Sequence, residues 1–255
     1  AAGHRDGCDA GVVLGNADAN HQPRTLCIVQ SSTLLCTSSG FGNNRLEIRM
    51  IKIFRISQIN NQDIHPQTLR QLQKNLRLID NQTRENKEAN SLFIQILTDK
   101  SNNESTLRRM NEAGVLGKFI PEFERIVGMM QFNMYHKYTV DEHTIQCIKT
   151  LAKIEQGLLK EDLPLASKIL KDGVNRKVLY LSLLLHDIGK GLPEDHSLAG
   201  ATMANSITSR LGFDKQESEL TSWLIKNHLL MSDIAQKRDL SEPKTIRDFA
   251  NIIKS

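Results

Sequence analysis

The sequence predicts an all-α fold, and three observations support this. From Leu46 onward, apolar residues recur at steps of three and four, the spacing that places them on one face of a helix. Prolines and glycines stand where such helices would begin and end. After residue 66 there is no low-complexity tract or long linker, so helical patterns follow one another along the chain.

The amino-terminal stretch, residues 1–44, has a different character. It is rich in Gly, Asn, Ser, Thr and Asp and shows no sustained period, so it is expected to be irregular. Within it, residues 25–29 and 33–36 have the composition of short strands. Residues 46–54 begin with strand-like alternation and continue with helical spacing, which favours a helix.

Pro66 opens the first clear helix, because proline suits the first helical turn and apolar residues at steps of three and four extend the pattern to Ile79. Further helical patterns cover residues 84–98, 104–113, 122–132, 141–156, 164–171, 176–187, 198–211, 216–230 and 243–254. Several of these carry end signals: Ser197 before Leu198 is a candidate cap, Gly114 and Gly212 are candidate ends, and Pro243 is a candidate start.

Apolar stripes within these helices predict core positions. Leu220, Trp223 and Leu224 share one helical face and are expected to be buried. Met129, Met130 and Met134 are interpreted as packing residues rather than as a partner groove.

Composition excludes several classes of function. The net charge of +4 is small and only 5% of residues are aromatic, so no nucleic-acid footprint is expected. The longest apolar stretch, residues 178–185, is too short to cross a bilayer. The amino terminus lacks a secretion signal, which makes the cytoplasm the expected location. The cysteines are widely spaced and are expected to be reduced thiols: Cys8, Cys27, Cys36 and Cys147.

Two metal-binding side chains, His186 and Asp187, close the apolar run that ends at Leu185. An imidazole nitrogen beside a carboxylate oxygen suits a divalent metal such as zinc, manganese, iron or magnesium. Neighbouring helical residues point about 100° apart, but both can converge on one ion if Gly189 ends the helix. The pair therefore predicts a metal site.

Other histidines gather in the same part of the sequence. His143 lies at the head of a predicted helix, and His228 follows Leu224 by four residues on the inward face of its own helix. Taken alone, His228 is better interpreted as a hydrogen-bonded core residue than as a ligand. His136 is not expected to be a ligand.

The run His-Asp-Ile-Gly-Lys-Gly from His186, with His143 upstream and His196 and His228 downstream, resembles the HD superfamily of metal-dependent phosphohydrolases. The resemblance implies a helical bundle with His143, His186 and Asp187 as metal ligands. It also implies that His196 and His228 complete a second metal site where there are two ions.

Longer runs narrow the resemblance. They are residues 111–123, 130–136, 138–144, 194–197, 223–232 and 238–240. Together they resemble the bifunctional uridylyltransferase/uridylyl-removing enzymes of bacterial nitrogen control, from about residue 46 to the last residue. The resemblance implies a helical remnant of the nucleotidyltransferase region over 45–132 and an HD domain over 133–255, truncated at its carboxyl end. In that family one domain attaches uridylyl groups to a tyrosine of the PII signalling protein, and the HD domain removes them.

The sequence also departs from the family pattern. A transferase needs a Gly-Gly or Gly-Ser turn followed by an Asp-x-Asp pair that holds magnesium, but Asp18-Ala19-Asn20 offers one carboxylate and Gly40-Phe41-Gly42-Asn43 precedes no acidic pair. Transferase activity is therefore not expected. The family places a further aspartate ligand and two ACT domains beyond the position of Ser255. Asp233 and Asp239 are nearby acids, and Asp239 better fits a helix start or an interface.

The resemblance implies a phosphodiesterase that uses a divalent metal, with Mn²⁺ or Mg²⁺ preferred and Zn²⁺ or Fe²⁺ as alternatives. The metal would activate water for attack on uridylyl-tyrosine in PII, with UMP as product. Lys190 would offset charge on the phosphate, unless it is simply a solvated lysine, and His196 would orient the phosphate or bind a second ion. Two alternatives stay open: another HD-type nucleotide phosphohydrolase, and a non-catalytic module that binds PII or a metal.

Overall fold

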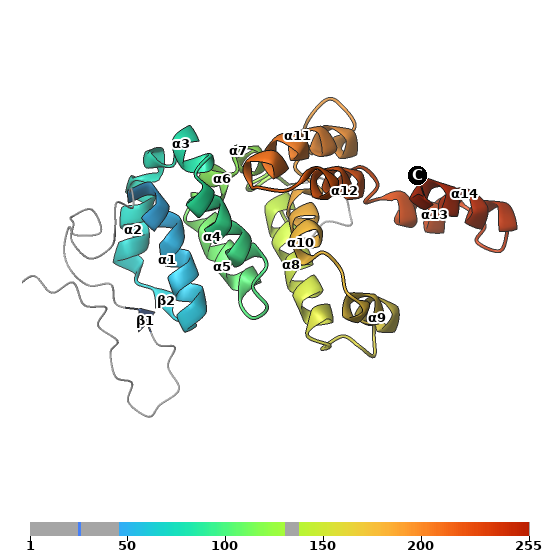
Figure 1. Cartoon of the computed structure of the whole chain (residues 1–255), viewed down its shortest axis with the longest axis horizontal. Helices are drawn as coiled ribbons and strands as arrows, with labels where there is room; N and C mark the ends of the chain where they lie inside the picture. The colour runs from blue at the N-terminus through green and yellow to red at the C-terminus, as the bar shows by residue number, and fades with distance from the viewer. Residues whose placement is uncertain (1–24, 27–45, 131–137, 255) are drawn as a thin grey trace, which may run out of the picture. The chain divides into compact units, whose positions relative to one another are not determined.

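The computed structural model describes residues 25–26, 46–130 and 138–254 of the chain, and within these ranges it is built almost entirely of helices (Figure 1). The predicted all-α class is confirmed. The chain divides into two compact units, Ala1–Phe119 and Ile120–Ser255, which are described separately. Among the described residues, no helix has the length and apolar character needed to span a membrane.

The first unit is organised around three helices that pack against one another, α1, α4 and α5. Its elements are β1 (Thr25–Leu26), α1 (Leu46–Asn60), β2 (Asp63–Ile64), α2 (Pro66–Lys74), the 3₁₀ turn η1 (Leu76–Leu78), α3 (Asn81–Arg84), α4 (Lys87–Leu97), α5 (Asn103–Glu112) and α6 (Val115–Phe119). Phe54 is fully buried, and the rings of Phe93 and Phe119 lie 5.2 Å apart in the core. The two short strands pair in parallel, with Thr25 opposite Asp63.

Two predictions for this unit need adjustment. The helix expected over 84–98 is broken, because Asn86 caps α4 by accepting hydrogen bonds from the amides of Glu88 and Ala89. The helix that begins at Pro66 ends at Lys74 and continues only as a 3₁₀ turn. The end of α5 is as expected, since Gly114 follows it with a φ of +75°. The strand expected over 33–36 lies outside the described residues.

The second unit is a bundle in which α8 packs on α10, and α12 packs on both α10 and α11. Its elements are α7 (Pro121–Glu124), α8 (Val140–Glu155), α9 (Pro164–Asp172), α10 (Arg176–Leu185), α11 (His196–Arg210), α12 (Lys215–Lys226), α13 (Leu230–Lys237) and α14 (Pro243–Lys254). Glu155 on α8 pairs with Arg176 and accepts a hydrogen bond from Tyr180, both on α10. These contacts fix α8 beside α10 at the end remote from His186.

The structure corrects three predicted helix boundaries here. The helix expected over 122–132 stops at Glu124. The helix expected over 216–230 ends at Lys226, so His228 lies in the turn before α13 rather than on a helical face. The cap of α11 is Asp195, whose carboxylate accepts hydrogen bonds from the amides of Ser197 and Leu198. Ser197 is buried inside the first turn instead.

Predictions about packing were only partly right. Leu220 is 46% exposed and Trp223 is half-buried, because α12 turns Thr221 and Ile225 inward rather than the predicted stripe. Met130 is exposed, so the packing role predicted for it is wrong. Met134 lies outside the described residues, as do Cys8, Cys27 and Cys36, while Cys147 is a free thiol.

Candidate metal centre

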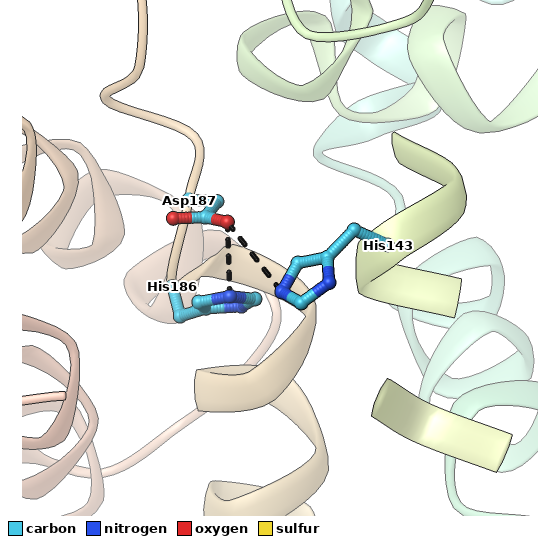
Figure 2. A group of neighbouring side chains, drawn as sticks. All are labelled: His143, His186 and Asp187. Atoms are coloured by element: carbon cyan, nitrogen blue, oxygen red, sulfur yellow. Dashed lines mark ion pairs between the residues drawn. The ribbon is translucent and has the colours of Figure 1, made fainter. Parts of the chain in front are cut away.

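Helix α10 carries the His186-Asp187 pair at its carboxyl end. Its apolar residues anchor it, with Leu181, Leu184 and Leu185 fully buried. The helix ends at Leu185, and His186 caps it while still in helical conformation, with φ −57° and ψ −31°. Asp187 lies in the turn that follows. Figure 2 shows the two side chains turned toward each other and toward His143 from the neighbouring helix.

His143 enters the site from the first turn of α8. That turn is held in place by Asp141, whose carboxylate accepts a hydrogen bond of 3.1 Å from the amide of Gly128. The amide of Val140 also donates to the carbonyl of Met129. The start of α8 is thus tied to the segment before it, and the direction of the His143 ring follows from that attachment.

The carboxylate of Asp187 is the centre of the cluster and is 2% exposed. Its Oδ2 lies 3.1 Å from Nε2 of His186, 4.0 Å from Nε2 of His143 and 2.8 Å from Nζ of Lys190. Its Oδ1 lies 3.8 Å from Nε2 of His228. A single carboxylate therefore faces three imidazoles and one ammonium.

The tautomers of two of these histidines follow from their backbone partners. Nδ1 of His186 lies 2.7 Å from the carbonyl of Leu183, and Nδ1 of His228 lies 2.7 Å from the carbonyl of Ile225. A carbonyl can only accept, so each Nδ1 carries a proton, and each Nε2 is the atom turned toward Asp187. With a second proton, Nε2 of His186 donates to Asp187 at 3.1 Å; without that proton, its lone pair is free to bind a metal ion.

The donor atoms form two groups with the spacing of a metal site. His143, His186 and Asp187 make one, and Asp187, His196 and His228 make the other, with the atoms of each group within 4.8 Å of one another. The rings of His186 and His228 lie 5.2 Å apart, and those of His196 and His228 lie 5.4 Å apart. Two imidazole nitrogens and a carboxylate oxygen are a donor set that binds divalent metals. The residues present therefore fit a divalent ion.

The protonation states of this cluster favour the binding of a cation. Burial raises the pKa of Asp187, but the hydrogen bonds and positive charges of His186 and Lys190 outweigh it and hold that pKa well below its usual value. Burial lowers the pKa of His228, and the neighbouring His186 adds to the effect. Asp187 is thus an anion at neutral pH, and His228 is biased toward the neutral form that can act as a ligand.

Lys190 and His196 take their positions from the turn after α10. The side chain of Lys190 is 14% exposed in its ion pair with Asp187, so the alternative of a solvated lysine is wrong. A Cβ at Gly189 would run into the carbonyl of His196 and would lie 2.8 Å from the amide nitrogen of Gly200. Gly189 therefore allows α11 to approach closely, and it does not end α10 as predicted.

The cluster lines a cavity of about 620 Å³. The wall consists of His143, Leu179, Ser182, Leu183, His186, Asp187, Lys190, His196, Leu224, His228 and Leu229. The six residues that the sequence predicted to bind the metal or the phosphate all line this cavity. Asp233 and Asp239 do not line it. Asp233 instead pairs with Lys237, and Asp239 accepts hydrogen bonds from Ser241.

Sequence reasoning missed two kinds of residue around the cluster. Ser182 and Leu183 lie four and three positions before His186, a spacing that could have identified them because it places them on the same helical face. Cys147 lies one turn after His143, with its Sγ 3.5 Å from Nε2 of that ring. Burial and the negative charge of Asp187 raise the pKa of its thiol.

Two family profiles match the chain in succession. The profile of the third domain of uridylyltransferase GlnD matches residues 43–119, and the profile of the HD domain matches residues 140–254. A protein of Cereibacter sphaeroides is 47% identical over 258 residues, and one of Ruegeria pomeroyi is 56% identical over 209 residues. Both are named bifunctional uridylyltransferase/uridylyl-removing enzyme. The matches cover 96% and 82% of this chain but only 28% and 23% of those relatives.

Proposed function

The chain belongs to the family of bifunctional uridylyltransferase/uridylyl-removing enzymes, and from this we propose that it carries the uridylyl-removing chemistry. In this proposal the substrate is the PII signalling protein with a uridylyl group on a tyrosine, and the products are UMP and free PII. The observation that carries the proposal is the Asp187 cluster, because it provides ligands for a divalent metal within the segment that matches the HD domain.

We further propose how the chain is divided between the parts of the family architecture. Residues 45–132 would be the helical remnant of the nucleotidyltransferase region and 133–255 the HD domain, with 1–44 unassigned. The two profile matches, to 43–119 and 140–254, support this division. The chain spans about a quarter of the length of these relatives. Uridylyltransferase activity is not part of the proposal, because the sequence shows no Gly-Gly or Gly-Ser turn followed by an Asp-x-Asp pair.

His143, His186, Asp187 and His228 would hold the metal, with Mn²⁺ or Mg²⁺ favoured and Zn²⁺ or Fe²⁺ as alternatives. When bound, such an ion lowers the pKa of water and polarises a phosphoryl group. The backbone carbonyls that hold Nδ1 of His186 and of His228 keep both Nε2 atoms turned into the site. Outer hydrogen bonds of this kind orient metal-binding histidines and increase their basicity.

Lys190 and His196 would act on the phosphate itself. The ammonium of Lys190 lies beside Asp187, so it can offset negative charge on the non-bridging oxygens as the reaction proceeds. His196 would orient the phosphate from the first turn of α11. The oxygen of water bonds to phosphorus while the bond from phosphorus to the tyrosine oxygen breaks, and the proton that water loses passes to solvent or to the departing tyrosine oxygen. Tyrosine, with a reference pKa of about 10, leaves without a strong general acid.

The test is release of UMP from uridylylated PII with and without added Mn²⁺. We expect metal-dependent release by the wild-type chain and a loss of about 100-fold or more for His186→Ala, because the variant lacks a direct ligand. His65→Ala is the matched control, since His65 precedes α2 in the first unit and caps that helix. A chain that binds Mn²⁺ but releases no UMP would contradict the proposal and favour a non-catalytic binding module.

A further inference from the structure

Four leucines line the same cavity as the metal ligands, and we call the part of the cavity that they line the leucine compartment. Leu179 and Leu183 on α10 contribute to it, with Leu224 on α12 and Leu229 in the turn after it. Its walls remain open to a ligand, since three of these leucines are only half-buried and Leu229 is 41% exposed. The whole cavity, at about 620 Å³, has the size of a small-molecule site rather than of an ion site.

Ser182 is the polar residue of this apolar part. It lies one helical turn before His186 on α10, on the same side of the helix. The residue is 6% exposed, and its Oγ has neither a hydrogen-bond partner nor contact with solvent. Such a hydroxyl costs stability, so buried polar groups without partners are rare in native proteins.

Two buried threonine hydroxyls in helices of the same unit are paired, unlike that of Ser182. Thr144 donates to the carbonyl of Val140 at 2.9 Å, and Thr208 donates to that of Ala204 at 2.9 Å. Both bonds follow the usual pattern, in which a helical hydroxyl pairs with the carbonyl four residues earlier. Ser182 lacks this bond, although it lies in a regular part of α10 and borders the cavity.

We propose that the leucine compartment takes the pyrimidine base of the uridylyl group and that the hydroxyl of Ser182 hydrogen-bonds to a polar atom of that base. The inference rests on the proposed function, because it specifies which part of the substrate lies beside the metal site. The base is a flat ring that four leucines can cover, and its carbonyl and N–H groups need partners once buried. Rotation about the Cα–Cβ bond moves the hydroxyl between staggered positions.

The other ring of the substrate fits this compartment less well. The ring of an esterified tyrosine has no polar atom except the oxygen bound to phosphorus, and that atom must lie at the metal end. It would leave Ser182 without a partner. A tyrosine on a folded PII protein also brings its polypeptide backbone, so it is expected at the mouth of the cavity.

The test compares two ligands that differ only in the base. Binding of UMP and of ribose 5-phosphate is measured by calorimetry with Mn²⁺ present, for the wild-type chain and for Ser182→Ala. We expect the wild-type chain to prefer UMP. We expect Ser182→Ala to weaken UMP binding by roughly 3- to 10-fold, the effect of one neutral hydrogen bond, and to leave ribose 5-phosphate unchanged.

Ser167→Ala provides the matched control. Ser167 on α9 is also buried with an unpartnered Oγ, but it does not border the cavity. Both alanine variants should melt at or above the wild-type temperature, because each removes a buried hydroxyl without a partner. Only Ser182→Ala should weaken UMP binding. A serine with a purely structural role would not produce this difference between the two variants.

Three results would overturn the inference: no UMP binding, equal binding of UMP and ribose 5-phosphate by the wild-type chain, or equal weakening of both ligands in Ser182→Ala. The proposed function fails in a different way. If UMP binds through its base but no UMP is released from uridylylated PII, the inference about base binding is supported and the catalytic proposal is contradicted.

Discussion

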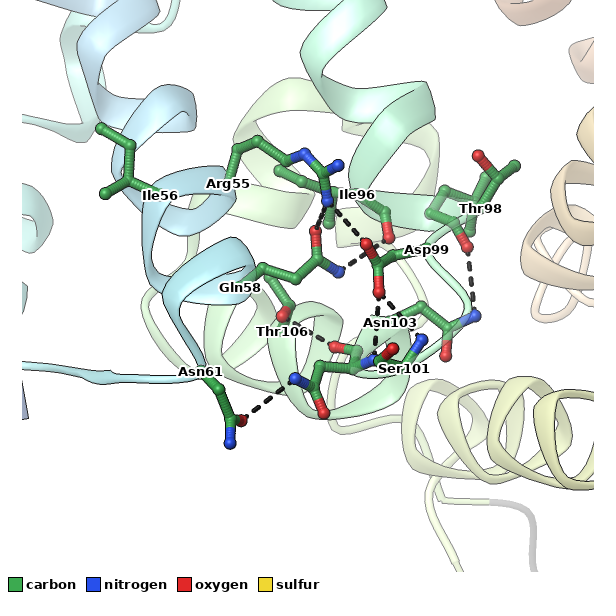
Figure 3. A network of polar contacts seen from close by, with 12 residues as sticks. Arg55, Ile56, Gln58, Asn61, Ile96, Thr98, Asp99, Ser101, Asn103 and Thr106 are labelled. Carbon is green, nitrogen blue, oxygen red and sulfur yellow. Dashed lines mark hydrogen bonds and ion pairs between the residues drawn. The ribbon is translucent and has the colours of Figure 1, made fainter. Parts of the chain in front are cut away.

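Two polar networks, one in each unit, use similar residues for different roles, with the side chain of Asp99 21% exposed and that of Asp187 2% exposed. In the first unit Arg55 on α1 donates to Asp99 at 2.8 Å and to Gln58 at 2.6 Å (Figure 3). The second oxygen of Asp99 accepts hydrogen bonds from the amides of Ser101 and Asn102. This carboxylate has one cation and two backbone donors, so its acceptors are used within the protein.

The Asp187 network of the second unit is not closed in this way. Its carboxylate pairs with Lys190, and it also faces Nε2 of His186 at 3.1 Å and Nε2 of His228 at 3.8 Å. The imidazoles around Asp187 can give up a proton and bind a metal ion, which the backbone donors of Asp99 cannot do. A carboxylate among imidazoles therefore indicates a metal site, whereas one held by an arginine and backbone amides indicates a structural role.

The largest expected effect is that of Asp187→Asn on metal binding. Affinity for Mn²⁺ should fall by about 100-fold or more, because Asp187 is the anion shared by both donor groups. The metal-free variant should stay folded, since the amide of asparagine can donate to Nε2 of His186 and its oxygen still faces Lys190. Calorimetry with Mn²⁺ and thermal melting in chelator measure the two quantities. If the affinity for Mn²⁺ were unchanged, the Asp187 network would no longer differ from the Asp99 network as a metal site.

Gly189→Ala should have the next largest effect, this time on stability. The new Cβ would meet backbone atoms of α11, which cannot move aside as a side chain would, so we expect a loss of roughly 3 kcal/mol. Gly200→Ala is the paired control. Its Cβ would meet the side chain of Ile225 at 3.2 Å, and alanine favours the helix, so its effect should stay within about 1 kcal/mol. Equal losses in urea unfolding would contradict this reading of Gly189.

Asp99→Asn should have a smaller effect than Gly189→Ala, a loss of about 2 kcal/mol in unfolding free energy with no change in Mn²⁺ affinity. Burial raises the pKa of Asp99, but hydrogen bonds from Arg55 and the backbone hold it below its usual value. The stability it contributes is therefore present above its unfolded pKa of about 3.9 and is lost as pH falls through the lower folded pKa. Urea unfolding at pH 7 and pH 3 should show the gap to wild type shrinking.

A control for that experiment exists in the second unit. Asp233 pairs with Lys237 at 2.8 Å, but both side chains are more than half exposed. Asp233→Asn should change stability by less than about 0.5 kcal/mol. If it costs as much as Asp99→Asn, the cost of the first network does not come from its burial.

The sequence predicted the helices, and which residues form the metal cluster, better than it predicted where those residues lie in space. His186 and Asp187 were recognisable as a metal-binding pair from residue type and order, His143 was added to them by the family resemblance, and the structure brings the three together. The turn that holds His228 was not predictable, because α12 ends at Lys226 by local hydrogen bonds that leave no periodic signature. The role of Gly189 depends on a contact with α11, and one sequence does not indicate which glycines face another backbone.

Packing errors have a similar origin. The stripe of Leu220, Trp223 and Leu224 has helical spacing, but which face of α12 turns inward is set by its neighbours, and Thr221 and Ile225 occupy that face. Ser182 lies within the apolar run of residues 178–185, and its residue type alone predicted no role. Its importance became visible only once its oxygen was seen to lack a partner.

The carbonyls of Leu183 and Ile225, which hold the rings of His186 and His228, both lie in the last turns of their helices. Helix ends are the parts that open most readily in native proteins. Here, opening of the last turn of α10 or of α12 would release the imidazole it orients. Occupancy of the site and closure of these two turns are therefore linked, and amide hydrogen exchange near Leu185 and Lys226 should slow when the site is filled.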